Sequence, residues 1–292
     1  MKVAIFGNII TPETRPFIET LHNELLAINA TIRVNQKLNY FIKDHCDLQL
    51  AFPDFSSHEE LVLFNPDFLI TIGGDGTILD AVTIIRDSGI PILGINTGRL
   101  GFLSNVNKEK ITDAVAALSQ GNYTIDERIV LETDTKIQDS ALNFALNEVT
   151  VSRKNTTAMI TIHTWINDEY LNSYWADGLI ISTPTGSTGY SLSCGGPIIM
   201  PGSENFVITP IAPHNLNVRP FVIPNNYKIR LKVEGREEQF LVSLDSRIYA
   251  LNSGLDINLQ LGSFKIKMVK TEVQNFTETL RNKLLWGLDR RN

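Results

Sequence analysis

The sequence predicts an α/β N-terminal domain with an open, mainly parallel sheet and flanking helices, followed by a β-rich C-terminal domain. Three observations lead to this prediction. Across residues 1–122, apolar strand-like runs alternate with helical segments, an order typical of a parallel sheet covered by helices. Across residues 123–275, most apolar runs are short and strand-like, and turn residues separate them. An amphipathic segment then predicts a C-terminal helical tail over residues 276–292.

The composition fits a packed globular protein, with 292 residues, 43% hydrophobic side chains and a formal net charge of −6. No basic block stands out, so we expect neither a nucleic-acid partner nor a membrane surface. No apolar run approaches the roughly 18 residues of a membrane span, and the polar residues soon after Met1 argue against a signal peptide. Cys46 and Cys194 lack a metal-binding spacing, so we expect a reducing, cytoplasmic location.

The elements of the first domain follow from apolar periodicity and from helix-start signals. Thr11 precedes a proline and an acid, which predicts the beginning of a helix. Ser57 and Glu60 have the spacing of a capping box, which predicts another. In order, we expect a strand near residues 1–8, a helix through Phe17, Leu21 and Leu25, a strand over 32–34, helices over 38–45 and after Ser57, a strand over 68–72, a helix from Thr77, a strand over 92–95 and a helix over 107–118.

In the second domain we expect mainly strands. They are predicted over residues 125–133, 142–151, 159–165, 178–183, 206–210, 227–233, 240–244 and 264–269, and the closing helix over 276–286. One polar, glycine-rich segment, residues 182–196, interrupts this pattern.

The segment Thr71–Asp80 is the first candidate site. It follows an apolar strand-like run and precedes a helical one, so it forms a strand-to-helix turn whose N–H groups can hold an anion. Its three glycines allow a ligand to approach the backbone. Asp75 is the one charged residue inside the turn, and no Lys or Arg occurs between Leu69 and Ala81. A phosphate site of this kind requires a metal ion and offers a proton acceptor.

Two further features lie in the second half. Asp177–Ser193 crowds hydroxyl groups onto a glycine-containing turn directly after an apolar strand, although a plain surface loop would have a similar composition. Asn147 and Glu148 interrupt an apolar run. A buried glutamate is costly unless it is paired or hydrogen-bonded, so the alternative is an edge strand with a solvated carboxylate.

Taken together, these segments resemble the NAD kinase family. The resemblance rests on Gly73-Gly74-Asp75-Gly76, Asn147-Glu148 and Thr183–Ser193, in this order and spacing, with further matches at Asn96–Leu103, Pro213–Pro220 and Leu244-Asp245-Ser246. It extends from about residue 60 to the C-terminus. The glycine turn alone is also similar to turns of phosphofructokinases and of lipid kinases of the diacylglycerol and sphingosine type.

The resemblance implies transfer of the γ-phosphoryl group of ATP to the 2′-hydroxyl of the adenosine ribose of NAD, in a cleft between the two domains. Asp75 would accept the proton of that hydroxyl, and such general-base help typically contributes about 10²–10⁴ in rate. The structural alternative is a turn-forming aspartate that binds its own backbone. Mg²⁺, or another divalent cation, would enter with ATP, and no residue of the chain is assigned as a metal ligand.

The resemblance also implies nucleotide-binding residues. The amide of Asn147 would read adenine and the carboxylate of Glu148 would accept from ribose hydroxyls. Tyr190 could stack on a ring, and Gly189 stands where many relatives carry Ala. The full predicted set is Gly73, Gly74, Asp75, Gly76, Thr77, Asn147, Glu148, Trp175, Asp177, Thr185, Thr188, Gly189, Tyr190, Ser191, Leu192, Ser193 and Arg247.

Some predicted contacts have open alternatives. Family members are homo-oligomers, commonly tetramers, and we expect a tetramer or dimer in which Trp175 approaches the NAD of another subunit. A buried core tryptophan is the alternative. Arg247 stands where some relatives carry Gln, so it could instead meet a phosphate.

Other functions are less well supported. A lipid kinase would share the glycine turn but not the hydroxyl-rich segment, and a non-catalytic dinucleotide-binding sensor would not need Asp75. A Rossmann dehydrogenase is weaker still, because no Gly-x-Gly-x-x-Gly follows the first strand.

Overall fold

The computed structural model describes residues 1–8, 12–45, 52–98, 101–104, 106–135, 137, 140–154, 158–271 and 276–285. Thr11, Cys46 and Trp286 lie outside the described residues. The chain divides into two compact units, residues 1–127 with 266–292 (unit 1) and residues 128–265 (unit 2). The sequence instead suggested divisions after residues 122 and 275. Residues 266–271 belong to unit 1 because Met268 of the last strand pairs with Ile92.

Unit 1 is built on a parallel sheet. Its strands pair in the order β3-β2-β1-β4-β5, and every pair in this series is parallel. The strands are β1 (Lys2–Phe6), β2 (Thr31–Asn35), β3 (Asp54–Phe55), β4 (Phe68–Ile72), β5 (Ile92–Asn96) and β6 (Val106–Asn107). The α-helices are α1 (Arg15–Ala27), α2 (Gln36–His45), α3 (His58–Phe64), α4 (Asp75–Ile85), α5 (Ile111–Gln120) and α7 (Phe276–Leu284). The predicted α/β domain is confirmed.

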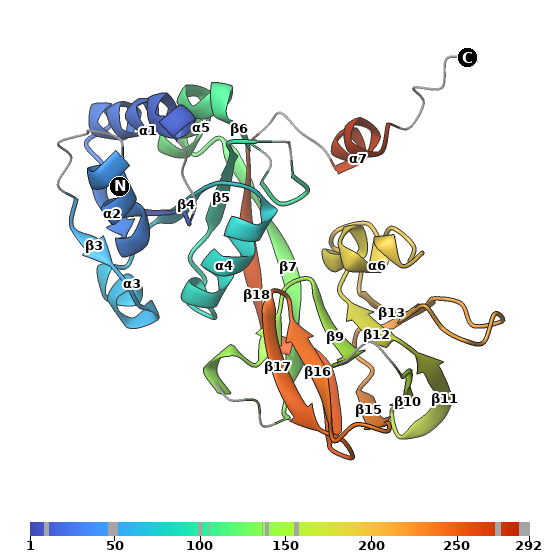
Figure 1. The fold of residues 1–292 in the computed structure, drawn as a ribbon. Helices are drawn as coiled ribbons and strands as arrows, with labels where there is room; N and C mark the ends of the chain where they lie inside the picture. Colours follow the sequence, from blue (N-terminus) through green and yellow to red (C-terminus); the bar gives the residue numbers. More distant parts are fainter. Residues whose placement is uncertain are drawn as a thin grey trace, which may run out of the picture. The chain divides into compact units, whose positions relative to one another are not determined.

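Helices cover both faces of this sheet. Ile5 of β1 packs in one apolar cluster with Leu21 of α1 and Val115 of α5, and these two helices lie side by side (Figure 1). Gly94 alternates with cluster residues along β5 and therefore points to the opposite face. There, a Cβ at Gly94 would lie only 2.7 Å from the side chain of Ile78, so α4 packs closely on this side.

The two predicted helix starts have different outcomes. The helix expected from Thr11 begins as the α-helix α1 only at Arg15, because a short 3₁₀ turn, Pro12–Thr14, precedes it. At α3 the capping prediction is confirmed, since the hydroxyl of Ser57 accepts from the backbone N–H of Glu60 at 3.3 Å. The Glu60 carboxylate in turn accepts from the N–H of Ser56 at 2.7 Å.

Unit 2 is almost entirely antiparallel. One sheet has the order β14-β13-β12-β9-β16-β17, and the strands β11, β10, β15 and the first part of β18 pair in a second group. Side chains of both groups, among them Val151, Leu179, Ile162 and Leu231, form one apolar core. The strands are β8 (Phe144–Ala145), β9 (Glu148–Arg153), β10 (Ile160–Ile166), β11 (Glu169–Ala176), β12 (Gly178–Ser182), β13 (Asn205–Ile211), β14 (Phe221–Pro224), β15 (Ile229–Glu234), β16 (Gln239–Leu244) and β17 (Arg247–Asn252), with β7 (Tyr123–Thr133) and β18 (Asp256–Thr271) crossing the unit boundaries. The short helix α6 spans Tyr190–Ser193.

Several strands differ from the sequence-based expectation. The run predicted over residues 142–151 is broken into β8 and β9, and the break contains Asn147. β11, β14 and β17 were not predicted. In β11 and β17 polar residues interrupt the apolar alternation, and β14 is only four residues long. The β-rich character of this unit is nevertheless confirmed.

Candidate functional site

The glycine turn of unit 1 lies between β4 and α4, as expected. Gly73 has φ = +150°, and a Cβ there would meet the Thr77 hydroxyl at 2.1 Å, so the fold itself requires this glycine. Gly74 and Gly76 are different, because a Cβ at either position would meet no atom of the described residues within 4 Å. Their backbone therefore faces open space next to the first turn of α4.

Asp75 is the first residue of α4, and its carboxylate is already hydrogen-bonded. Oδ2 accepts from the backbone N–H of Phe102 at 2.8 Å, and Oδ1 accepts from Leu103 at 3.0 Å and Ser104 at 2.9 Å. These donors belong to the segment after β5, not to the turn itself. A carboxylate oxygen has two lone pairs, so Oδ2 can still accept one more proton or hydrogen bond.

The segment that holds Asp75 is tied to the glycine turn by further bonds. The hydroxyl of Ser104 donates to the carbonyl of Gly73 at 3.1 Å, and the N–H of Gly73 donates to the carbonyl of Ile95 at 3.0 Å. A Cβ at Gly101 would lie 1.7 Å from Asp75 Oδ1. The close approach of this segment to the carboxylate therefore requires glycine at residue 101.

In unit 2, the backbone of residues 146–148 is held by a second buried acid. Asp245, in the turn between β16 and β17, accepts from the N–H groups of Leu146 at 2.8 Å, Asn147 at 2.7 Å and Glu148 at 3.1 Å. Its own N–H donates to the carbonyl of Glu148 at 3.0 Å. Sequence reasoning noted Asp245 only as part of a matching segment and gave it no role.

The same segment is fixed from its other side by Thr183. The N–H of Thr183 donates to the carbonyl of Asn147 at 2.9 Å, and its hydroxyl donates to the carbonyl of Leu146 at 2.6 Å. β9 lies between β12 and β16, so the alternative of an edge position for Glu148 is wrong. The buried oxygens Asn147 Oδ1 and Glu148 Oε2 have no hydrogen-bond partner within the described part of the chain.

The hydroxyl-rich turn is more internal than its composition suggested. The Ser187 hydroxyl donates to the carbonyl of Pro184 at 2.7 Å, and the Ser191 hydroxyl pairs with Thr209 at 2.8 Å. Thr185 is also buried and accepts from Arg128 at 3.3 Å. These hydroxyl groups stabilise the turn, whereas Thr188, Gly189, Tyr190, Leu192 and Ser193 reach its surface.

Both halves of the chain match known family models. Residues 4–123 match the ATP-NAD kinase N-terminal domain, and residues 146–271 match the ATP-NAD kinase C-terminal domain. The chain belongs to the NAD kinase family.

Individual relatives support this assignment over the full length. The NAD kinase of Flavobacterium psychrophilum is 52% identical over 295 residues, and that of Flavobacterium johnsoniae is 50% identical over 297, each comparison covering 100% of both chains. Among solved structures, yeast NADH kinase complexed with NADH has a TM-score of 0.88 at 24% identity, covering 100% of this chain and 89% of that one. The NAD kinase from Archaeoglobus fulgidus in complex with ATP has a TM-score of 0.75 at 24% identity, covering 97% of both.

Glu148 has the most perturbed acid-base behaviour among the predicted site residues of this NAD kinase family member. Burial, and to a lesser extent the charge of Asp245, raises the pKa of Glu148 to about 8. The carboxyl group is therefore mostly protonated at neutral pH, where it can donate one hydrogen bond as well as accept.

The raised pKa of Glu148 predicts a pH-dependent stability. The unfolded group has a pKa near 4.5, so between about pH 4.5 and 8 the folded chain holds a proton that the unfolded chain has released. Its contribution to stability is therefore greatest below pH 4.5 and decreases as the pH rises towards 8. In urea unfolding, Glu148→Gln should gain stability over wild type progressively from pH 5 to 8. The exposed-residue control Glu169→Gln should show no such gain, and a constant difference for Glu148→Gln would contradict the account.

Other predicted residues lie at the surface of unit 2. Trp175 is 51% exposed and its ring centroid lies 4.2 Å from that of His214, so the alternative of a buried core tryptophan is wrong. Tyr190 is 46% exposed. Asp177 forms an ion pair with Arg153 at 3.0 Å. Exposure leaves both aromatic rings accessible to a ligand or to another subunit.

The Arg247 side chain makes several contacts within the protein that the sequence did not predict. Its guanidinium donates to the carbonyl of Leu142 at 2.5 Å and to that of Phe144, and it lies 3.9 Å from the Asp245 carboxylate. Its side chain is only 15% exposed. These contacts support the hairpin turn that carries Asp245, and contact with a substrate phosphate stays a prediction.

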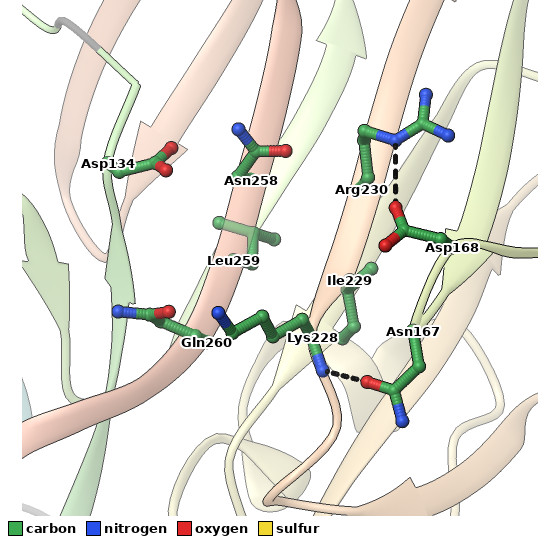
Figure 2. A pocket seen from close by; sticks show the side chains of 9 residues that line it. All are labelled: Asp134, Asn167, Asp168, Lys228, Ile229, Arg230, Asn258, Leu259 and Gln260. Atoms are coloured by element: carbon green, nitrogen blue, oxygen red, sulfur yellow. Dashed lines mark hydrogen bonds and ion pairs between the residues drawn. The ribbon is translucent and has the colours of Figure 1, made fainter.

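Among the described residues, each unit contains a pocket. One of about 330 Å³ in unit 1 is lined by Phe6, Asn8, Asn35, Gln36, Lys37, Ser56, Asp80, Thr83 and Ile84. The other, of about 350 Å³ in unit 2, combines acidic, basic and amide side chains, with Asp168 3.9 Å from Arg230 (Figure 2). The second pocket includes none of the predicted site residues.

The described residues contain neither a metal-binding cluster nor a membrane-spanning helix. Across these ranges, no group of three or more His, Cys, Asp and Glu side chains could hold a metal ion. None of the helices described above is long and apolar enough to cross a membrane.

Proposed function

We propose that the chain transfers the γ-phosphoryl group of ATP to the 2′-hydroxyl of the adenosine ribose of NAD, giving NADP and ADP, with Asp75 as proton acceptor. The observation that best supports this proposal is the pair of buried oxygens, Asn147 Oδ1 and Glu148 Oε2, for which the described residues provide no hydrogen-bond partner. Buried polar atoms normally have a hydrogen-bond partner. A nucleoside with an amino group and two ribose hydroxyls would provide partners for both.

In this proposal, unit 1 binds the phosphates of ATP. The N–H groups at the start of α4 carry a partial positive charge, and Gly74 and Gly76 leave room for phosphate oxygens beside them. The unit 1 pocket lies at the carboxyl ends of β1 and β2, where open α/β sheets bind ligands, and Lys37 adds a positive charge to its lining. We infer that this pocket receives part of the ATP molecule.

The role of Gly76 can be tested by its replacement with alanine. Because a Cβ there meets no atom of the described residues within 4 Å, Gly76→Ala should raise the free energy of unfolding by up to about 0.5–1 kcal/mol through better helix propensity. It should also raise KM for ATP, because the added methyl group occupies the space left for phosphate. Unfolding and initial-rate measurements together check both effects, and an unchanged KM for ATP would contradict the assignment.

Asp75 would act on the acceptor hydroxyl. Three N–H donors fix the carboxylate in one orientation, and the remaining lone pair of Oδ2 would receive the hydroxyl proton as the oxygen attacks phosphorus. The bond from phosphorus to the ADP oxygen breaks in the same displacement. Asp75 would thus orient a weak nucleophile and take its proton.

In this proposal, unit 2 binds NAD. The Asn147 amide would read adenine, and Glu148 would bind the ribose hydroxyls as donor or acceptor. Of the other predicted residues, Tyr190 and Trp175 offer exposed rings, and Thr188, Gly189 and Ser193 lie on the accessible side of the turn.

We propose that Mg²⁺ enters with ATP. Mg²⁺ is commonly held by substrate phosphates with only one or two protein carboxylates, and the described residues contain no larger cluster. When bound, the ion would offset phosphate charge that the glycine turn, which lacks Lys and Arg, leaves uncompensated.

We also propose a cytoplasmic homo-oligomer, a tetramer or dimer. Exposed apolar side chains on unit 2, among them Trp175, Leu216, Phe221 and Val222, offer a surface for a second copy. Light scattering coupled to size-exclusion chromatography should give a mass of two or four chains, and a monomer at assay concentration would contradict this part of the proposal.

The activity itself is tested by incubating purified protein with ATP, Mg²⁺ and NAD and detecting NADP with an NADP-specific dehydrogenase. We expect turnover that a chelator abolishes. NAD binding by calorimetry without turnover would favour a dinucleotide sensor. Phosphorylation of diacylglycerol or sphingosine vesicles, with no NADP, would favour a lipid kinase.

A further inference from the structure

We propose that Asp245 is a positioning residue for NAD: it fixes the backbone of residues 146–148 and thereby the direction of the Asn147 and Glu148 side chains. The inference rests on the proposed NAD-binding role of these two residues. Asp245 itself does not touch the substrate in this account.

The geometry of the contact is specific to a carboxylate. Three consecutive N–H groups point at the two oxygens of one side chain, with distances between 2.7 and 3.1 Å. Residues 146 and 147 lie in the break between β8 and β9, where a regular ladder cannot pair all of these donors. A side chain with two acceptor oxygens can accept all three bonds, whereas an amide offers only one oxygen.

The hairpin turn is built to present this carboxylate. Asp245 adopts φ = +52°, a left-handed conformation that Asp and Asn tolerate better than most residues. Its side chain is 3% exposed. The Arg247 guanidinium lies 3.9 Å from it and also donates to the carbonyls of Leu142 and Phe144, on the chain just before the break. The turn therefore holds both sides of the break at once.

Charge links Asp245 to Glu148 as well. Burial raises the pKa of Asp245, while the three N–H donors and Arg247 oppose that rise. In its charged form Asp245 contributes to the high pKa of Glu148. Among the described residues, Arg247 pairs with Asp245. Burial raises the pKa of Tyr190, and the nearby Cys194, Asp177 and Glu148 raise it further.

Asp245→Asn tests the inference, with Asp168→Asn as a matched control. Both aspartates have a positive φ, which asparagine tolerates, and both lie in hairpin turns of unit 2. They differ in burial, because the side chain of Asp168 is 93% exposed. We expect Asp245→Asn to raise KM for NAD at least tenfold, with kcat and KM for ATP within about threefold of wild type. The pH dependence of KM for NAD should also move to lower pH, because the charge that raises the pKa of Glu148 is gone. The control should change none of these values.

A double variant separates this inference from the proposed function. If Asp245 acts through residues 146–148, Asn147→Ala and Asp245→Asn should be strongly non-additive in KM for NAD. If Asn147→Ala raises KM but Asp245→Asn only lowers the unfolding temperature, the positioning role is overturned while the binding role stands. If Asn147→Ala leaves KM unchanged, both are overturned.

If Asp245→Asn does not fold, the variant Thr183→Val tests the same inference. Thr183→Val keeps the side-chain shape but removes the hydroxyl that donates to the carbonyl of Leu146 at 2.6 Å. It should raise KM for NAD in the same direction and by a smaller factor. Folded Thr183→Val with wild-type KM for NAD would overturn the claim that the position of this backbone limits NAD binding.

Discussion

Replacement of Asp75 by Asn should lower kcat by about two to four orders of magnitude while NAD still binds. The amide has nearly the same size as the carboxylate, but it cannot accept the proton of the ribose hydroxyl. The expected loss lies in kcat because Asp75 is proposed to act on the reacting oxygen, whereas Asn147 and Glu148 are proposed to provide the binding contacts. Initial rates at saturating ATP and NAD, with NAD binding by calorimetry, measure the two effects separately.

The control for this variant is Asp113→Asn. Asp113 occupies the first turn of α5 as Asp75 occupies the first turn of α4, so both substitutions remove an acid from a helix start. Asp75→Asn also weakens the bonds to residues 102–104, and thermal unfolding of the two variants measures that cost. Wild-type turnover in Asp75→Asn would refute the role as proton acceptor.

Gly186→Ala should damage both stability and NAD binding. A Cβ at residue 186 would lie 2.1 Å from the carbonyl oxygen of Asn147 and 2.5 Å from its carbonyl carbon, so the backbone must move. Overpacking of this kind typically costs about 1–3 kcal/mol. Because the displaced backbone carries Asn147, whose amide is proposed to bind adenine, KM for NAD should rise at least tenfold. Urea unfolding and initial rates measure the two effects.

Gly189→Ala, three residues further along the same turn, is the matched control. Its Cβ would lie 3.3 Å from the carbonyl of Gly186 and 3.4 Å from Glu148 Oε2, contacts that small shifts can relieve. We therefore expect stability and KM for NAD close to wild type. If both substitutions changed stability and KM for NAD equally, the contact of residue 186 with the Asn147 backbone would not explain the effect of Gly186→Ala.

The sequence predicted the fold well where periodicity and local chemistry act alone. The parallel sheet of unit 1 followed from buried runs such as Phe68–Ile72, and the capping box at Ser57 is local to its helix. Strands with one exposed face, such as Arg247–Asn252, were not predicted, because polar and apolar residues are mixed along them. The division into units also differed, since the pairing of Met268 with Ile92 joins residues far apart in the chain.

The sequence did not predict the contacts that hold the candidate site residues in place. Asp245 lies 97 residues from Glu148, and only the pairing of β9 with β16 brings its turn to residues 146–148. Composition equally failed to show that the Ser187 hydroxyl bonds within the turn, to Pro184, and that the Ser191 hydroxyl pairs with Thr209 of β13. The N–H donors on Asp75 come from a segment 27 to 29 residues away, which local sequence reasoning could not assign.

The most direct test of the account uses an NAD analogue in which hydrogen replaces the 2′-hydroxyl of the adenosine ribose. Purified protein is incubated with Mg²⁺, ATP labelled at the γ-phosphate, and either NAD or the analogue. We predict that NAD becomes labelled, whereas the analogue competes with NAD for binding and remains unlabelled. Transfer of label to the analogue would place the accepting oxygen elsewhere and contradict the proposed reaction.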